Sequence, residues 1–268
     1  MAFIKYEDCI VNLNDKVVFA NRAQLSASAK IEPSRNMLGE LIRYSPTGPI
    51  EGSLDLSFYL TKNFQNNHQE FNILDIINSP EHLDAFSSGI TGSIAGVSFT
   101  NAYLNNFNFS VEPFSPVLIN ANFSIFGALS ASSNQSEGFS HLGRQEGQPA
   151  NGVNSFYTAA TELGVDHPIS FSYQASINRM INLEIGESIP TRAYKGNCSA
   201  TVNINSEGFG NSLKINGNEA ALTAHLYPLY STDPVGSFYC SGQLISQTLS
   251  TSSSDLLRGS LTIEQSLR

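Results

Sequence analysis

The residue types that most often do chemistry in proteins are few in this chain, and they stand far apart. The histidines are His68, His82, His141, His167 and His225. No two of them are four residues apart, and none lies in a His-Glu-x-x-His pattern, so they lack the spacing that places two ligands on one helix face. The sequence therefore predicts no metal site.

The cysteines also form no recognisable site. Cys9, Cys198 and Cys240 are odd in number and widely spaced, with no Cys-x-x-Cys pair among them. Such spacing is typical neither of a zinc site nor of a secreted disulfide framework. Cys198 and Cys240 lie in apolar, strand-like runs, and we predict buried thiols there that pack as small hydrophobic side chains.

Nucleophiles and paired carboxylates give no better candidate. Residues 138–143 (GFSHLG) lack the Gly-x-Ser-x-Gly spacing of a nucleophile elbow. Asp75, Glu81 and Asp84 are spaced like the solvated face of a helix, and no phosphate-binding glycine loop is present. We expect no catalytic, cofactor-binding or metal site and predict that the chain is not an enzyme. A β-sandwich glycan hydrolase is the enzymatic alternative, but the chain has no Trp for sugar stacking.

Composition narrows the class of partner. The chain has 14 basic and 23 acidic residues, a net charge of −9 and 14% charged residues. Nucleic-acid binding needs clustered Lys and Arg, so this balance argues against it. A surface of Ser, Asn, Thr and Gln loses less hydration on burial than a charged one, which suits contact with neighbouring proteins. The N-terminal residues contain no signal-peptide pattern and no apolar stretch is long enough to span a membrane, so we expect synthesis in a cytoplasm.

Strand patterns dominate the elements that would position any site. Apolar and polar residues alternate over residues 25–31, 53–60, 104–111, 117–126, 169–175, 198–204 and 260–264. Residues 70–87 break this pattern with apolar residues three and four apart, and Ser79 and Pro80 could begin a helix. We predict one or two short helices there. Residues 130–152 are polar and rich in Gly, as in a linker or long exposed loop.

The two halves of the chain resemble each other. Residues 25–60 can be laid on residues 169–204 with a constant offset of 144 and no gap, which matches Arg35 with Arg179 and Glu40 with Glu184. The fold class predicted from this is mainly β, with two tandem antiparallel sandwich or partial-barrel domains built from long hairpins. The expected boundaries are a first domain at 1–131, a linker at 132–160 and a second domain at 161–268.

Residues 101–127 (NAYLNNFNFSVEPFSPVLINANFSIFG) carry a family resemblance. The hairpin resembles the signature hairpin of bacteriophage tail-tube and related tube-like virion proteins. The matching residues are Leu104, Ser110, Pro113, Val117, Ala121, Phe123 and Gly127. The N-terminal hairpin is similar to the first hairpin of that family, and the predicted helix fits the one that such domains pack against their sandwich.

The resemblance implies a structural protein of the virion tail that assembles into stacked rings around a channel for DNA. With a duplicated domain, it implies a trimer with pseudo-sixfold symmetry, or otherwise a hexamer. The implied partners are copies of the chain and other tail proteins such as sheath, baseplate or terminator, while DNA passes without specific binding. Other virion roles remain open: tube initiator, terminator, baseplate ring or capsid decoration protein. Residues 34–48, 178–192 and 130–152 are the segments expected to contact the next ring.

Overall fold

The computed structural model describes an antiparallel, almost entirely β protein. The described residues are 11–18, 20–62, 89–131, 148–149, 157–158, 165–187, 189–190, 192–209, 219–227, 236–251 and 258–266. No helix occurs among them. The predicted fold class, mainly β with long antiparallel hairpins, is confirmed, whereas the helices predicted at 70–87 lie outside the described residues.

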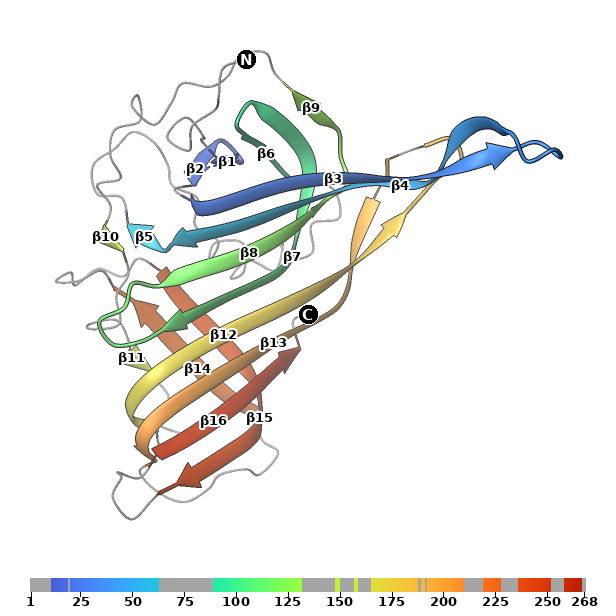
Figure 1. Cartoon of the computed structure of the whole chain (residues 1–268). Coiled ribbons are helices and arrows are strands. Elements are labelled where there is room, and N and C mark those ends of the chain that lie inside the picture. The colour runs from blue at the N-terminus through green and yellow to red at the C-terminus, as the bar shows by residue number, and fades with distance from the viewer. Residues whose placement is uncertain are drawn as a thin grey trace.

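Long strands form the body of the molecule (Figure 1). They are β3 (Ala20–Arg35), β4 (Leu41–Tyr59), β7 (Val97–Val111), β8 (Leu118–Ile125), β12 (Val165–Asn182), β13 (Arg192–Phe209), β15 (Gly236–Ser250) and β16 (Arg258–Ser266). The shorter strands are β1 (Val11–Leu13), β2 (Lys16–Val18), β5 (Thr61–Lys62), β6 (Ile90–Ile94), β9 (Leu129–Ala131), β10 (Gln148–Pro149), β11 (Tyr157–Thr158) and β14 (Glu219–Leu226). Strands β5 and β10 pair with each other in a separate small sheet.

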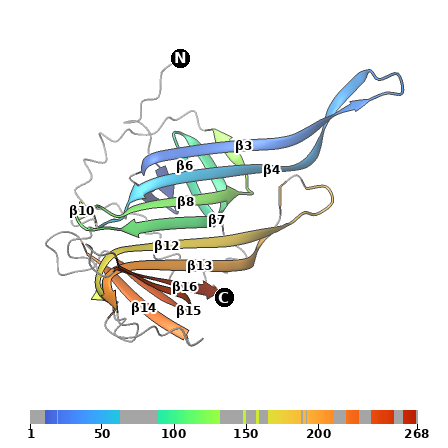
Figure 2. The same cartoon turned by 60° about the horizontal axis from the view of Figure 1, so that its bottom comes forward.

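The long strands pair side by side in the order β3-β4-β8-β7-β12-β13-β16-β15, which we call the main row. Most of this row is visible in Figure 2 as neighbouring strands whose axes are roughly aligned. Strand β7 joins the two halves of the chain. One of its edges pairs with β8 and β9, and the other pairs with β6 near its start and with β12 near its end.

Tight turns and alternating side chains explain the local structure. Asn14 and Asp15 turn β1 into β2, and both have positive φ values (49° and 60°), as a two-residue hairpin turn of this kind requires. Ala95 and Gly96 do the same between β6 and β7. Over the body of β4, β8, β7, β12, β13 and β16, alternate side chains are buried in one continuous hydrophobic core that includes residues of both halves. Most of β3 and the end of β15 are exposed or only partly buried.

The two halves have the same strand order. The first half has β3-β4-β8-β7-β6 and the second has β12-β13-β16-β15-β14. The β7–β8 ladder and the β15–β16 ladder also match in detail. Each has one extra, unpaired residue, which is Asn105 in β7 and Ile245 in β15. The ladders thus place Asn105 and Ile245 in equivalent positions, at an offset of 140.

The offset of 144 from the sequence does not match the first hairpin. Leu25 pairs with Leu54, and the offset of 144 would pair residues 169 and 198. Cys198 instead pairs with Ile177. The pair equivalent to Leu25–Leu54 is Tyr173–Val202, and both members lie 148 positions later. The sequence offset failed because a slip of four residues preserves the alternation of apolar and polar side chains. Most of the predicted linker at 132–160 lies outside the described residues, and the division into two domains stays a prediction.

Candidate functional site

One face of the main row is covered mostly by small, uncharged polar side chains, with a few charged residues among them. Its members, which we call the polar face, point away from the core on alternate positions of every strand. On the first half they are Arg22, Gln24, Ser26, Ser28, Glu51, Ser53, Asp55, Ser57, Asn106, Asn108, Ser110, Asn120, Asn122 and Ser124. On the second half they are Ser170, Ser172, Gln174, Ser176, Ser199, Thr201, Asn203, Asn205, Ser246, Thr248, Ser250, Arg258, Ser260, Thr262 and Glu264.

Side chains on the polar face bond to one another across the strands. The Asn122 amide donates to Asp55 at 2.6 Å, and the Asn120 amide donates to Asn108 at 3.1 Å. In the second half, the Thr262 hydroxyl donates to Asn203 at 2.8 Å. Such cross-strand pairs hold the side chains in place and occupy part of their hydrogen-bonding capacity. The result is an ordered polar surface with no concentration of charge.

The charge of the polar face is slightly acidic. Arg22 and Arg258 are its two basic residues; the Arg22 guanidinium reaches Gln24 at 3.4 Å, and Arg258 pairs with Ser250 at the margin of the face. Glu51, Asp55 and Glu264 are its three carboxylates. Because phosphate groups are held mainly by Lys and Arg, this surface offers DNA almost no favourable charge.

Two long edges of the sheet have no strand beside them in the described part of the chain. Strand β3 pairs with β4 alone, and β15 has only β16 as a neighbour after Gln243, where its ladder with β14 ends. Residues 23–29 and 244–250 contain neither charged residues nor proline, which are common protections of an exposed edge. In contrast, the other terminal strands of this sheet, β2, β9 and β11, are very short.

Both long hairpins extend beyond the body of the sheet in the same direction (Figures 1 and 2). The first arm consists of residues 30–50 and the second of residues 178–195. They contain the predicted contact segments 34–48 and 178–192. The third segment, 130–152, lies almost wholly outside the described residues.

The first arm is ordered at its tip and apolar on its surface. The Asn36 side-chain oxygen accepts from the backbone amides of Leu38 and Glu40, and Gly39 supplies the positive φ of 81°. This turn holds Met37 and Leu38 outward, with exposed fractions of 106% and 84%. Further exposed apolar residues on this arm are Ile31, Leu41, Ile42, Tyr44 and Ile50.

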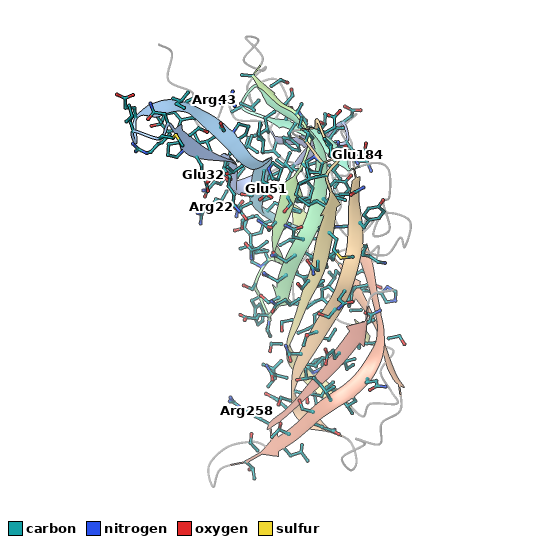
Figure 3. All side chains as sticks on the ribbon, turned by 90° about the vertical axis from the view of Figure 1, so that its right-hand side faces the viewer. Arg22, Glu32, Arg43, Glu51, Glu184 and Arg258 are labelled. Carbon is teal, nitrogen blue, oxygen red and sulfur yellow. The ribbon has the colours of Figure 1, made fainter. Side chains whose placement is uncertain are left out.

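The second arm is similar but carries fewer apolar residues. Met180, Leu183 and Ile185 are exposed on it, Ile185 fully so. Charged residues of both signs accompany them. Figure 3 shows Glu32 and Arg43 along the first arm and Glu184 on the second. A patch of this kind, apolar with charges interspersed, is typical of a surface that a partner protein covers.

The predicted buried thiols are confirmed. Cys198 and Cys240 are both buried thiols that are not joined in a disulfide. Burial raises the pKa of the Cys240 thiol to about 12, so it stays protonated at neutral pH. Burial likewise raises the pKa of the nearby Tyr173 phenol, whose hydroxyl has no hydrogen-bond partner among the described residues. Both are packing residues rather than reactive groups.

The histidines and carboxylates considered for chemistry either lie on separate strands or fall outside the described residues. His167 and His225 are on β12 and β14, whereas His68, His82 and His141 are outside the described residues. Asp75, Glu81, Asp84 and residues 138–143 are also outside them. In the described ranges, no group of three or more His, Cys, Asp or Glu side chains could hold a metal ion. Within the same ranges, no helix is long and apolar enough to cross a membrane.

Sequence reasoning located the strands but missed the polar face. Its signal was present, because Ser, Asn and Thr occupy the outward positions of strand after strand. Residues 104–111 read LNNFNFSV, with Phe at the inward positions and Asn or Ser between them. The strand order was needed to show that these positions join into one surface.

A scan against models of known protein families gave no match for this chain. A search of curated protein sequences also gave no match.

Proposed function

We propose that the chain is a virion structural protein that assembles into the rings of a phage tail tube, with the polar face lining the channel. The observation that carries this proposal is the polar face itself. It extends across the main row, carries only two basic side chains against three carboxylates, and belongs to a sheet whose two outer strands are open to other copies. A channel for DNA needs a wall of this chemistry, because a basic wall would bind the phosphates and stop the passage.

The direction of the arms supports stacking of rings. If copies join edge to edge, their strands run roughly along the axis of the ring, because pairing extends a sheet across its strands. The arms continue the strands β3, β4, β12 and β13, so they project from one end of the ring. Their exposed Met, Leu and Ile side chains are then available to the next ring along the axis.

The opposite end of the sheet also presents an apolar side chain. The turn between β7 and β8 lies at the end away from the arms, because Tyr59 pairs with Leu118 and the Leu60 amide donates to Val117. Phe114 in this turn is 81% exposed. Apolar groups at both ends of one unit fit a head-to-tail stack, in which each interface joins the two unlike ends.

Electron microscopy of the purified protein tests the proposal. We expect rings or tubes with a central hole in negative stain at micromolar or higher protein concentration. Particles of a single chain at every concentration would overturn the proposal. Solid particles without a central hole would overturn it as well and would favour a decoration role.

A variant of the arm tip separates ring formation from stacking. Met37→Asp combined with Leu38→Asp places charge on the most exposed apolar residues, and we expect single rings without tubes. The matched control is Met37→Leu with Leu38→Met, which keeps the tip apolar and should still form tubes. Tubes of normal length from the Asp variant would contradict the role of the arm.

A further inference from the structure

The internal repeat of the chain provides a template for contact between copies. In the first half, the end of β7 pairs with β12, the first strand of the second half. We call this ladder the β7–β12 seam. It runs from Asn106 opposite Ser176 to Val111 opposite Phe171. Since β15 is the equivalent of β7 and β3 the equivalent of β12, the same pairing exists in principle between the second half of one copy and the first half of the next.

Both strands of the equivalent pair are open where the seam would form. After Gln243, no described strand pairs with the edge of β15 that faces away from β16. The outer edge of β3 has no described strand along its whole length. Figure 2 shows β3 as the outermost strand on one side of the row, with β16 and β15 toward the other. A single chain therefore cannot bring these two edges together.

We propose that copies of this chain join by antiparallel pairing of β15 in one copy with β3 in the next, in the register of the β7–β12 seam. This inference rests on the proposed ring assembly. The residue of β15 equivalent to each β7 residue lies 140 positions later, and the residue of β3 equivalent to each β12 residue lies 148 positions earlier. These offsets convert the pairs of the β7–β12 seam into the expected pairs between copies. Phe109 opposite Tyr173 becomes Leu249 opposite Leu25, and Asn108 opposite Gln174 becomes Thr248 opposite Ser26.

The chemistry of the two strands agrees with this register. Leu249 is 41% exposed in the single chain, although its equivalent, Phe109, is buried. Its expected partner Leu25 is partly buried and already packs against the edge of the core. The pairing would therefore cover Leu249 and extend the core across the boundary between copies.

The opposite face agrees as well. In the proposed register Ser246, Thr248 and Ser250 of one copy lie beside Ser28, Ser26 and Gln24 of the next. The polar face then continues from copy to copy without interruption. A register shifted by one residue would place Leu249 beside polar side chains on the wrong face, so the pattern of both strands disfavours it.

The absence of edge protection favours the same partner. Monomeric β proteins commonly guard long edges with charges, proline or bulges. The residues of β3 and β15 that form the proposed seam contain no charge and no proline. Edges left open at both ends of one row, with matching polarity, fit a second copy of this chain in a closed head-to-tail ring.

Engineered disulfides test the register. Ser26→Cys and Thr248→Cys are made in separate proteins, which are mixed, allowed to assemble and mildly oxidised. We expect a covalent dimer, because directly opposed Cβ atoms lie within reach of a disulfide. Leu25→Cys mixed with Leu249→Cys is the adjacent pair. Testing both pairs covers the alternation between hydrogen-bonded and non-hydrogen-bonded positions.

Matched controls distinguish the register from chance contact. Ser28→Cys mixed with Thr248→Cys is displaced by two residues, and we expect its yield of dimer to be roughly tenfold lower because the Cβ atoms are too far apart. Each single variant oxidised alone reports any reaction of the native cysteines. Equal yields from the opposed and displaced pairs would overturn the proposed register.

Microscopy of the same samples separates this inference from the proposed function. Rings without a cross-link at either opposed pair would overturn the β15–β3 pairing and leave the ring assembly standing. Neither rings nor cross-links would overturn both. Rings together with cross-links at the opposed pairs are the expected result.

Discussion

The end of β7 and the end of β15 are equivalent in the repeat but differ in what covers them. At the β7–β12 seam, Phe109 packs between Phe171, Tyr173 and Phe238, with ring centroids 5.7 to 5.9 Å apart. At the same place on β15 stands Leu249, with Leu25 as its expected partner. A seam within one chain forms during folding and can be built from large aromatic groups. A seam between copies leaves its residues in water until assembly, so smaller aliphatic and hydroxyl side chains suit it better.

The largest expected effect is on the covered seam. Phe109→Ala removes a buried ring from the aromatic cluster, and we expect the free energy of unfolding to fall by about 3–5 kcal/mol. The equivalent change, Leu249→Ala, should alter the stability of the single chain by less than about 0.5 kcal/mol, because this side chain is half exposed. Chemical denaturation of the unassembled protein measures both. Equal losses of unfolding free energy would show that Leu249 is packed in the single chain as well as Phe109 is.

The next effect is on assembly. Leu249→Lys places a charge in the proposed seam, and Thr248→Pro removes one backbone donor from β15. We expect Leu249→Lys to abolish rings while the unfolding midpoint stays within a few degrees of that of the original chain. Thr248→Pro provides a second variant that acts through the backbone.

The control for these variants is on an exposed position of the same strand outside the ladder. Ile245 is the extra residue of the bulge and is 51% exposed. Ile245→Thr should therefore retain assembly. Size-exclusion chromatography with light scattering distinguishes rings from single chains. Normal rings from Leu249→Lys would argue that this edge does not face another copy.

The same comparison shows what could be read from the sequence and what could not. Alternation located the strands and the buried Cys198 and Cys240, because burial on one face leaves a period of two in the residue types. It could not set the offset between the halves, since slips of an even number of residues preserve the period. The bulges at Asn105 and Ile245 and the position of the arms depend on pairing between distant segments. The polar face depended on knowing that β7 pairs with β12 across the middle of the chain.

A smaller effect is expected on the outward side of the covered seam. Asn108→Lys with Gln174→Lys adds two positive charges to the polar face without touching either open edge. We expect assembled tubes of this variant to retain DNA at low salt and release it as salt increases, because phosphate contacts displace counterions. The matched variant, Asn108→Asp with Gln174→Glu, should retain none. Filter binding of labelled DNA measures this difference, and retention by both variants would argue that this face does not line a channel.

The smallest expected effect concerns the Tyr173 hydroxyl inside the covered seam. This hydroxyl is buried and has no hydrogen-bond partner within the described part of the chain, so Tyr173→Phe should raise the free energy of unfolding by about 1 kcal/mol. The phenol also predicts a pH dependence. Burial raises its pKa in the folded chain, whereas an unfolded tyrosine ionises near pH 10.

Above about pH 10 the unfolded chain therefore binds fewer protons than the folded one, and stability falls as pH rises. Tyr173→Phe should reduce this alkaline slope by up to about 1.4 kcal/mol per pH unit, which denaturation curves between about pH 9 and pH 11 can measure. Cys240, whose pKa burial raises to about 12, contributes a slope of the same sign that remains in the variant. An unchanged slope would mean that the phenol ionises alike in both states. Leu25, the equivalent of Tyr173 on the open edge, has no titrating group, so the proposed seam between copies should lack this alkaline sensitivity.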